Sequence, residues 1–222
     1  MKRYLPFVIV GVVALATLTS ATILYRAKRP AVLTISQENA AKTEGPDAAH
    51  VRGNPAAAVT MEEFGDYQCP PCGMLNGLIK QLEKELDPHL RVIFRHFPLD
   101  NHVHARPAAA AAEAAGLQGK FWEMHDQLYQ EQAVWMKATD VQTLFHSYAG
   151  MLGLDIERFK KDMQSEAVKA RVDSDHKRGT SLGVKNTPTI FLNNTAVPPT
   201  DLNPERLRAI FTEAVKEKKP SS

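Results

Sequence analysis

The chain contains only two cysteines in 222 residues, within the stretch Cys69-Pro70-Pro71-Cys72. Cysteines at this spacing in the first turn of a helix lie roughly 5 to 6 Å apart between Cα atoms, a separation that a disulfide can bridge. Each cysteine therefore has one possible partner within the chain. The closed loop would be only four residues long and would stabilise a fold by roughly 2 kcal/mol. A purely structural role is a weak explanation for such a bond.

The residues after the pair predict a helix that begins at the cysteines. Apolar residues recur at helical spacing from Leu75 to Leu86, and Asp87-Pro88 ends the pattern. A helix N-terminus stabilises a thiolate through its free N–H groups and the positive end of its dipole. We therefore expect redox chemistry, with Cys69 as the solvent-facing attacking thiolate and Cys72 as the sheltered resolving thiol.

Residues 57–67, before the pair, predict a strand. Its alternation places Glu63 on the same face as the apolar residues Val59 and Met61. A carboxyl group buried behind the cysteines would have a raised pKa and could exchange protons with Cys72 during disulfide reduction. The alternative is that Glu63 reaches solvent at an edge of the sheet, and spacing alone does not decide between the two.

The order of predicted elements indicates an α/β fold. Residues 91–97 predict a second strand, and strand, helix and strand around a Cys-x-x-Cys motif are typical of a thioredoxin-like fold. Residues 99 to about 182 have helical character and are too many for a simple crossover, so they predict an inserted helical subdomain. Residues 189–192 return to strand character, and residues 202–218 predict a closing amphipathic helix.

The first 25 residues predict contact with a membrane. No charged residue lies between Tyr4 and Tyr25, and this apolar run is long enough to span a bilayer. A cleaved signal peptide and an uncleaved anchor are both possible, and the length of the run favours a transmembrane signal-anchor over residues 1–25. Basic residues flank both ends, so charge does not fix the orientation. An isolated, easily formed disulfide suits an oxidising compartment. We expect a single-pass cell-membrane protein with its catalytic domain on the extracytoplasmic (periplasmic) side.

Composition divides the rest of the chain into a linker and a domain. Residues 26–55 mix Pro, Gly, Ala and charge without periodicity and predict a linker, in which His50 would be a solvated residue. Residues 56–219 then form the folded domain. The first 30 residues hold five basic and no acidic residues, so the remainder carries 22 basic and 25 acidic residues, a formal charge of −3. This balance argues against nucleic acid as a partner.

Four histidines raise the alternative of a zinc site that includes the cysteines: His96, His102, His104 and His125. His102 and His104 lie about 30 residues beyond Cys72, across a predicted strand, whereas structural zinc sites bring their ligands in two tight pairs. We therefore expect no metal and no other cofactor at the cysteine pair, and we expect most of these histidines at the surface or at the subdomain interface.

Four segments together resemble the DsbA-like thiol:disulfide oxidoreductases, which have a thioredoxin fold with a helical insertion. These are Glu63–Cys72, Phe94–Leu99, the alanine-rich stretch with Gly119–His125, and Gly183–Thr189. The resemblance covers about residues 56–219. It implies that Cys69 is the nucleophile, Cys72 the resolving cysteine and Glu63 the buried acid that precedes the nucleophile by six residues.

The same resemblance assigns a role to Thr187-Pro188. In the family this position is a loop that faces the disulfide, with a cis-proline that pairs with the substrate backbone. Two features depart from the strongly oxidising members. Pro70-Pro71 replaces a pair that includes a thiolate-stabilising histidine, and Thr187 replaces a valine, as in disulfide isomerases. We expect a less depressed pKa at Cys69 and a less oxidising disulfide than in those members.

The resulting hypothesis is an extracytoplasmic thiol:disulfide oxidoreductase that acts as an oxidant on cysteine-containing exported proteins. A membrane quinone-linked oxidase or reductase partner would recycle the cysteine pair. Thr187 and Pro70-Pro71 keep a reductase or an isomerase as alternatives. A further alternative keeps the fold but makes the domain a tethered, non-enzymatic peptide-binding module with a structural disulfide.

Overall fold

The computed structural model describes residues 50–218. The expected signal-anchor (1–25) and most of the expected linker (26–55) lie outside these residues. Between residues 50 and 218, none of the helices has both the length and the apolar character needed to cross a bilayer.

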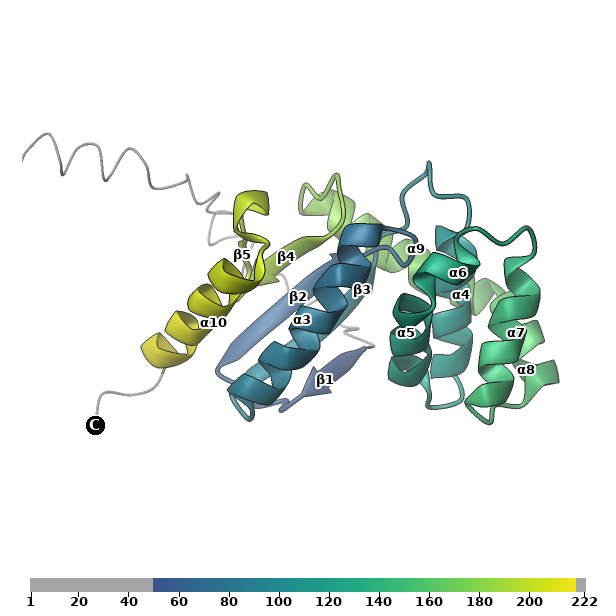
Figure 1. Ribbon diagram of the computed structural model, residues 1–222, viewed down its shortest axis with the longest axis horizontal. Coiled ribbons are helices and arrows are strands. Elements are labelled where there is room, and N and C mark those ends of the chain that lie inside the picture. Colours follow the sequence, from purple (N-terminus) through teal and green to yellow (C-terminus); the bar gives the residue numbers. More distant parts are fainter. Residues whose placement is uncertain (1–49, 219–222) are drawn as a thin grey trace, which may run out of the picture. The chain divides into compact units, whose positions relative to one another are not determined.

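The described chain forms a five-stranded sheet with helices around it (Figure 1). The strands, in sequence order, are β1 (Val51–Gly53), β2 (Val59–Gly65), β3 (Leu90–His96), β4 (Thr189–Leu192) and β5 (Thr195–Ala196). Their spatial order is β1-β3-β2-β4-β5, with β2 and β3 parallel and the other neighbours antiparallel. The longest strands, β2 and β3, are therefore central, whereas both edge strands are very short.

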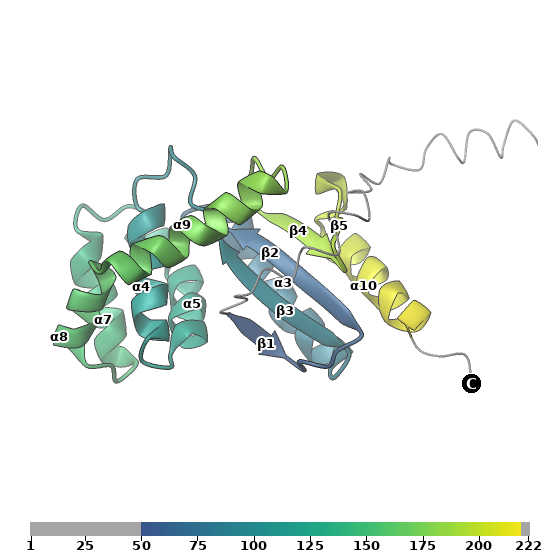
Figure 2. The same ribbon diagram turned by 180° about the vertical axis from the view of Figure 1, so that it is seen from behind.

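Helices connect β2 to β3 and β3 to β4, and a last helix follows β5. They are α3 (Pro70–Leu86), α4 (Ala105–Gly116), α5 (Phe121–Gln130), α6 (Gln132–Trp135), α7 (Val141–Met151), α8 (Ile156–Met163), α9 (Glu166–Ser181), a 3-10 turn (Pro199–Asp201) and α10 (Pro204–Lys218). α3 and α10 lie on one face of the sheet, and α9 runs along the other side from the insertion toward β4 (Figure 2). The helices α4 to α8 gather beside the sheet.

The predicted fold class is confirmed: the domain is α/β and thioredoxin-like, with helices inserted between β3 and β4. Strand 57–67 becomes β2, strand 91–97 becomes β3, and the helix after the cysteines ends at Leu86, before Asp87. The closing helix begins at Pro204. The insertion helices fall between Ala105 and Ser181, inside the expected range of 99–182.

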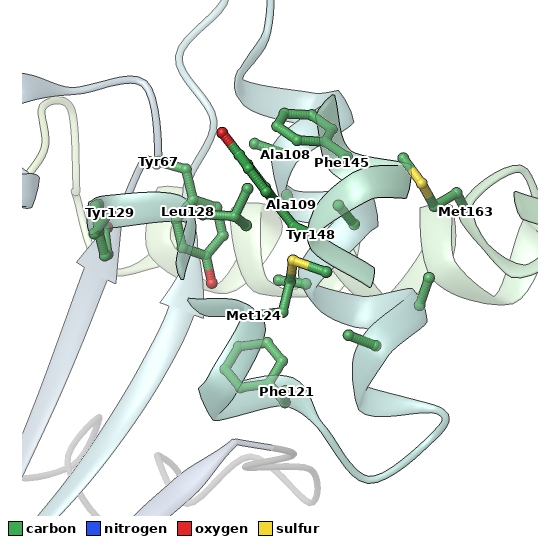
Figure 3. Close-up of a cluster of buried hydrophobic side chains, with 14 of the residues drawn as sticks. Tyr67, Ala108, Ala109, Phe121, Met124, Leu128, Tyr129, Phe145, Tyr148 and Met163 are labelled. Atoms are coloured by element: carbon green, nitrogen blue, oxygen red, sulfur yellow. The ribbon is translucent and has the colours of Figure 1, made fainter. Parts of the chain in front are cut away.

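Apolar side chains form separate clusters for the sheet and for the insertion. Residues of β2, β3, β4, α3 and α10 make one cluster, which includes Met61, Leu82 and Phe211. The other packs around the alanines of α4 and extends to Tyr67 and the cysteines (Figure 3). Small alanine side chains let neighbouring helices approach closely, so α4 is the centre of the insertion.

The prediction that His50 is a solvated residue is wrong. His50 is 8% exposed, and its backbone carbonyl accepts a hydrogen bond from the N–H of Phe94 in β3. β1 follows directly and pairs with β3 from Val51 to Gly53. Three residues are too few to show alternation in a sequence, so this edge strand gave no periodic signal.

Candidate functional site

The two cysteines occupy the start of α3, where the sequence placed them. Cys69 is the N-cap residue, with extended backbone angles (φ −79°, ψ 115°). Its carbonyl accepts the first hydrogen bonds of the helix, from the N–H groups of Cys72 (3.0 Å) and Gly73 (3.3 Å). Both cysteines are in the thiol form. The exposed fraction of Cys72 is zero, as its place on the apolar side of the helix predicts.

Cys69 is less accessible than the sequence predicted. Its exposed fraction is 5%, so the expectation of a solvent-facing side chain is wrong. The loop before β4 covers it: the Cys69 thiol donates to the carbonyl of Thr187 at 3.3 Å. The neighbouring Pro70 and Pro71 are exposed. Cys69 therefore lies just below an exposed rim, while Cys72 lies fully beneath the surface.

The electrostatic environment separates the two thiols. A hydrogen bond from the Cys72 thiol, opposed by partial burial, lowers the pKa of Cys69 to about 6. The Thr187 hydroxyl has no partner among the described residues in the thiol form and contributes to this lowering as a donor to the thiolate. Burial, together with the hydrogen bond to Cys69, holds the pKa of Cys72 well above its usual range. Near neutral pH, Cys69 is therefore the nucleophilic thiolate of the pair.

Glu63 is buried on β2, behind the cysteines, with an exposed fraction of 2%. Burial raises its pKa to about 8, and the charge of Arg52 opposes this shift. One of its oxygens, Oε1, has no hydrogen-bond partner among the described residues. The Glu63 charge also raises the pKa of Cys72, so the two groups interact. Of the two alternatives, the structure supports the buried carboxyl group and not the solvent-exposed one.

Thr187 and Pro188 lie over the cysteine pair, as the resemblance implied. The Thr187–Pro188 peptide bond is cis. The structure thus brings Cys69, Cys72 and Thr187 into contact and places Glu63 within electrostatic range of both sulfur atoms.

A buried aspartate that sequence reasoning missed holds the loop beside the cysteines. Asp66 is 2% exposed and accepts hydrogen bonds from the N–H of Gln68, the N–H of Leu99 and Nδ1 of His102, at 2.7, 2.9 and 2.7 Å. Its charge raises the pKa of Cys69 and so works against the thiolate. The polar stretch around Asp66 contained no signal beyond a strand end, because two of the three partners, Leu99 and His102, come from a loop more than thirty residues away.

The insertion contributes a second missed residue, Gln132 at the start of α6. Its Nε2 donates to the carbonyls of Tyr67 (2.6 Å) and Cys69 (2.9 Å). The amide oxygen lies over Gly73, where an added Cβ would come within 2.6 Å of it. A side chain at Gly73 would displace the Gln132 amide, so the glycine after Cys72 is required for the insertion to hydrogen-bond to the cysteine turn. The sequence pattern of α6 alone could not show which residue it faced.

Three buried residues near the insertion could in principle hold a metal ion. The donor atoms of His50, His96 and Glu113 all lie within 4.8 Å of one another. Both histidines, however, approach Glu113 Oε1 through Nε2 at 2.7 and 2.8 Å, which are hydrogen-bond lengths. The Arg171 guanidinium lies 3.9 Å from the same oxygen. His96 Nδ1 has no partner among the described residues, whereas metal-bound histidines almost always donate through their second nitrogen.

These observations favour a hydrogen-bonded histidine–glutamate–histidine cluster. Burial alone raises the pKa of Glu113, but the hydrogen bonds from His50 and His96 outweigh burial and lower the pKa to about 2. Of the other histidines weighed for zinc, His102 bonds to Asp66, and His125 lies between Tyr67 and Asn76. Among the described residues, none of these histidines is bonded to a cysteine sulfur.

The sheet order and the cysteine pair at the start of α3 define a class, the thioredoxin-like proteins. The thioredoxin family profile matches residues 46–213, and the chain belongs to that family. A thioredoxin-like oxidoreductase from Silicibacter pomeroyi DSS-3 is 29% identical, with a TM-score of 0.63 over 79% of this chain and 94% of that one. The thiol-disulfide exchange protein alpha-DsbA2 from Wolbachia pipientis shares the fold at 23% identity, with a TM-score of 0.61 over 75% of this chain and 85% of that one.

Part of the chain also matches a protein that is named as an ion antiporter. The Na(+)/H(+) antiporter NhaA 1 of Mycolicibacterium gilvum (strain PYR-GCK) is 38% identical over 153 residues, which make up 67% of this chain and 24% of that protein. The chain therefore spans about a quarter of the length of the curated relatives it matches.

Proposed function

We propose that this protein is an extracytoplasmic thiol:disulfide oxidoreductase that oxidises cysteine pairs in exported proteins through Cys69 and Cys72. The observation that carries this proposal is the contrast between the two thiols at the start of α3. Cys69 has a pKa of about 6, and Cys72 has a pKa well above its usual range. A stabilised Cys69 thiolate favours the reduced form of the pair, which makes its disulfide an oxidant.

The catalytic cycle begins with the Cys69–Cys72 disulfide. A substrate thiolate attacks the sulfur of Cys69, a mixed disulfide forms, and the bond to Cys72 breaks. The Cys72 sulfur leaves as a thiolate and takes a proton from the neutral carboxyl group of Glu63. A second substrate thiolate then attacks the substrate sulfur of the mixed disulfide and releases the Cys69 thiolate. Two electrons pass from the substrate to the cysteine pair, and Glu63 recovers its proton from solvent.

The loop before β4 supports substrate binding at the same place. The Thr187 carbonyl already accepts a hydrogen bond from the Cys69 thiol, and the exposed residues Pro70 and Pro71 form the rim beside it. An extended substrate segment would pair with the backbone at Thr187-Pro188 and so present its sulfur to Cys69.

Cysteine variants test the proposal directly. The wild-type protein should refold a reduced substrate with its disulfides formed, and Cys69→Ser should abolish this activity. Cys72→Ser should instead accumulate a mixed disulfide when it is given a substrate that already carries a disulfide. Its Cys69 thiolate attacks that bond and releases one substrate thiolate, and no Cys72 thiol is present to reduce the mixed disulfide, which is visible on a non-reducing gel. Full refolding activity in Cys69→Ser would disprove the mechanism.

A reductase or isomerase is the second candidate, and the Cys69 pKa supports keeping it. A value of about 6 lies between those of the strongly oxidising DsbA (about 3.5) and thioredoxin (about 7). We therefore expect a reduction potential between about −120 and −270 mV. A glutathione titration decides: a midpoint at the oxidising end supports the oxidant, and one at or below about −250 mV supports the reductase.

The cellular setting belongs to the same proposal. The apolar run from Tyr4 to Tyr25 supports a single-pass anchor. An isolated, easily formed disulfide suits an oxidising compartment and supports residues 50–218 on the extracytoplasmic side. A membrane quinone-linked partner would recycle the cysteines. Alkaline phosphatase fused after residue 49 should be active, and the intact protein should remain in the membrane fraction after a carbonate wash. An inactive fusion or release of the protein would contradict this placement.

A further inference from the structure

Two buried oxygen atoms near Cys72 have no hydrogen-bond partner among the described residues. One is Glu63 Oε1, and the other is the hydroxyl oxygen of Tyr129 in α5. The exposed fractions of these residues are 2% and 6%. Folded proteins rarely leave such groups unpaired, so each one needs an explanation.

Both atoms lie along the same face of β2. Gly65 follows Glu63 by two residues and so faces the same side, about 6.7 Å further along the strand. A Cβ on Gly65 would come within 3.0 Å of the Tyr129 hydroxyl oxygen, which places that hydroxyl against the strand. The Tyr129 hydroxyl is therefore within reach of the Glu63 carboxyl group, directly or through one water molecule.

Beside Glu63, Tyr129 has a hydroxyl group that makes no hydrogen bond to another described residue. Tyr67 lies beside it (Figure 3), with ring centroids 4.9 Å apart. The Tyr67 hydroxyl already bonds to His125 Nδ1 at 3.0 Å. Burial raises the pKa of Tyr129 well above its usual range, with further contributions from the charges of Cys72 and Glu63. Its proton therefore stays on the oxygen, and the group can act only as a neutral donor.

The other charged groups around Glu63 either already have a hydrogen-bond partner or carry a negative charge, which cannot stabilise a carboxylate. Arg52 of β1 lowers the pKa of Glu63, but its Nε bonds to Glu83 at 2.6 Å and its guanidinium stacks on Trp122 at 4.3 Å. Glu83 and Cys69, both at α3, raise the pKa of Glu63. None of these groups supplies a hydrogen bond to the Glu63 carboxylate in the structure.

We propose that Tyr129 is a positioning residue of the exchange reaction, whose hydroxyl donates to the Glu63 carboxylate once Glu63 has protonated Cys72. This inference deepens the proposed function and rests on it for its catalytic meaning. When the Cys69–Cys72 bond opens, the proton moves from Glu63 to the Cys72 sulfur and leaves a buried carboxylate. The Tyr129 hydroxyl then stabilises that charge without losing its own proton.

The test compares Tyr129→Phe with Tyr148→Phe, which removes a hydroxyl from another tyrosine of the same apolar cluster, in α7. The carboxyl stretching band of Glu63, assigned by its absence in Glu63→Gln, is followed by infrared spectroscopy as the pH is raised. In the wild type its midpoint should lie near pH 8. Tyr129→Phe should raise the midpoint by about one pH unit, because the carboxylate loses a donor. Tyr148→Phe should leave it unchanged. A midpoint that moves no more in Tyr129→Phe than in Tyr148→Phe overturns the proposal.

A kinetic measurement tests whether the hydrogen bond from Tyr129 to Glu63 affects the reaction. It does not depend on resolving an infrared midpoint. The rate at which dithiothreitol opens the disulfide should fall about tenfold at pH 7 in Tyr129→Phe, the equivalent of one pKa unit. The same substitution in the Glu63→Gln background should change the rate little, and equal losses in both backgrounds overturn the proposal.

The infrared titration needs no substrate. A protein that shows the shift but fails to oxidise substrates would therefore count against the proposed function and not against the Tyr129–Glu63 link.

Discussion

At the scale of single residues, the site works by holding two chemically identical thiols in different environments. The Cys69 carbonyl begins α3, and its thiol meets Thr187, whereas Cys72 is enclosed by the apolar cluster. Burial favours the neutral form of Cys72, and hydrogen bonds favour the charged form of Cys69. In the proposed cycle, the buried carboxyl group of Glu63 would supply a proton to the Cys72 sulfur when the disulfide opens.

The reactivity of Cys69 should report its pKa. Alkylation of the reduced protein by iodoacetamide should be half-maximal near pH 6. Thr187→Val should move this midpoint upward, because the thiolate loses a hydroxyl donor. Thr189→Val is the control: its hydroxyl bonds to the carbonyl of Asn186 at 2.7 Å and is exposed. An unchanged or lowered midpoint in Thr187→Val would contradict the role given to that hydroxyl.

Glu63 should make stability depend on pH. Its pKa is about 8 in the folded protein and about 4.5 in the unfolded chain, so the folded state binds the extra proton between these values. The stability linked to this proton is fully present below pH 4.5 and is lost as the pH rises through 8, by at most about 1.4 kcal/mol per pH unit. The free energy of unfolding of the wild type should therefore fall relative to Glu63→Gln over this range. The Cys69 titration is common to both proteins and cancels. A constant difference in urea unfolding from pH 5 to 8 would show that Glu63 does not titrate in this way.

At the scale of elements, the inserted helices take part in the site through α6. Gln132 holds the carbonyls of Tyr67 and Cys69 and fixes the turn that leads into α3. The absence of a side chain at Gly73 allows this contact. The insertion is therefore a support for the cysteine turn and not merely a cover over the sheet.

Two glycines of α3 allow this contact to be measured. Gly73→Ala should destabilise the protein by about 1 to 2 kcal/mol, because the new methyl group displaces the Gln132 amide from its two carbonyls. Gly77→Ala adds a methyl group at a position with no atom within 4 Å and should stabilise by about 0.5 to 1 kcal/mol through helix propensity. Equal effects of the two substitutions in urea unfolding would rule out the Gln132 contact as the reason for Gly73.

Most elements that the sequence predicted have a long repeating pattern, and β4, with four residues, was predicted from strand-forming residues alone. β2, β3 and α3 have seven or more residues each, so alternation and helical spacing were visible. The two edge strands have three and two residues and gave no such signal. Cys69, Cys72, Glu63 and Thr187-Pro188 stand at motif positions, whereas the positions of Gln132 and Tyr129 depend on how the insertion packs. The burial of Cys69 was misjudged for the same reason, since a loop 118 residues away covers it.

At the scale of the domain, buried ion pairs join the sheet to the insertion. Glu62 of β2 accepts hydrogen bonds from Arg95 of β3 at 2.9 Å and from Arg178 of α9 at 2.8 Å. Asp175 of α9 accepts from Arg95 at 3.0 Å and from the N–H of His96 at 3.2 Å, and it also contacts Arg171. The central strands and the long helix α9 therefore share one buried network of charges.

Breaking this network should weaken the whole domain. Asp175→Asn removes the carboxylate that Arg95 shares with Glu62 and that also contacts Arg171, so the buried network loses a charge, and this should cost about 3 kcal/mol. Asp173→Asn, two residues earlier on the same helix, removes an exposed pair with Arg106 and should cost no more than about 1 kcal/mol. Far-ultraviolet and near-ultraviolet circular dichroism should give coincident unfolding curves, because the sheet and the insertion unfold together. Separate transitions would contradict this coupling.

Within the described residues, the strands at both edges of the sheet are very short, Val51–Gly53 on one side and Thr195–Ala196 on the other. Unfolded polypeptides add readily to long, unpaired strand edges, and that is a common route to aggregation. If the domain oxidises unfolded proteins with free thiols, as proposed, these short edges would present little backbone to which such substrates could add.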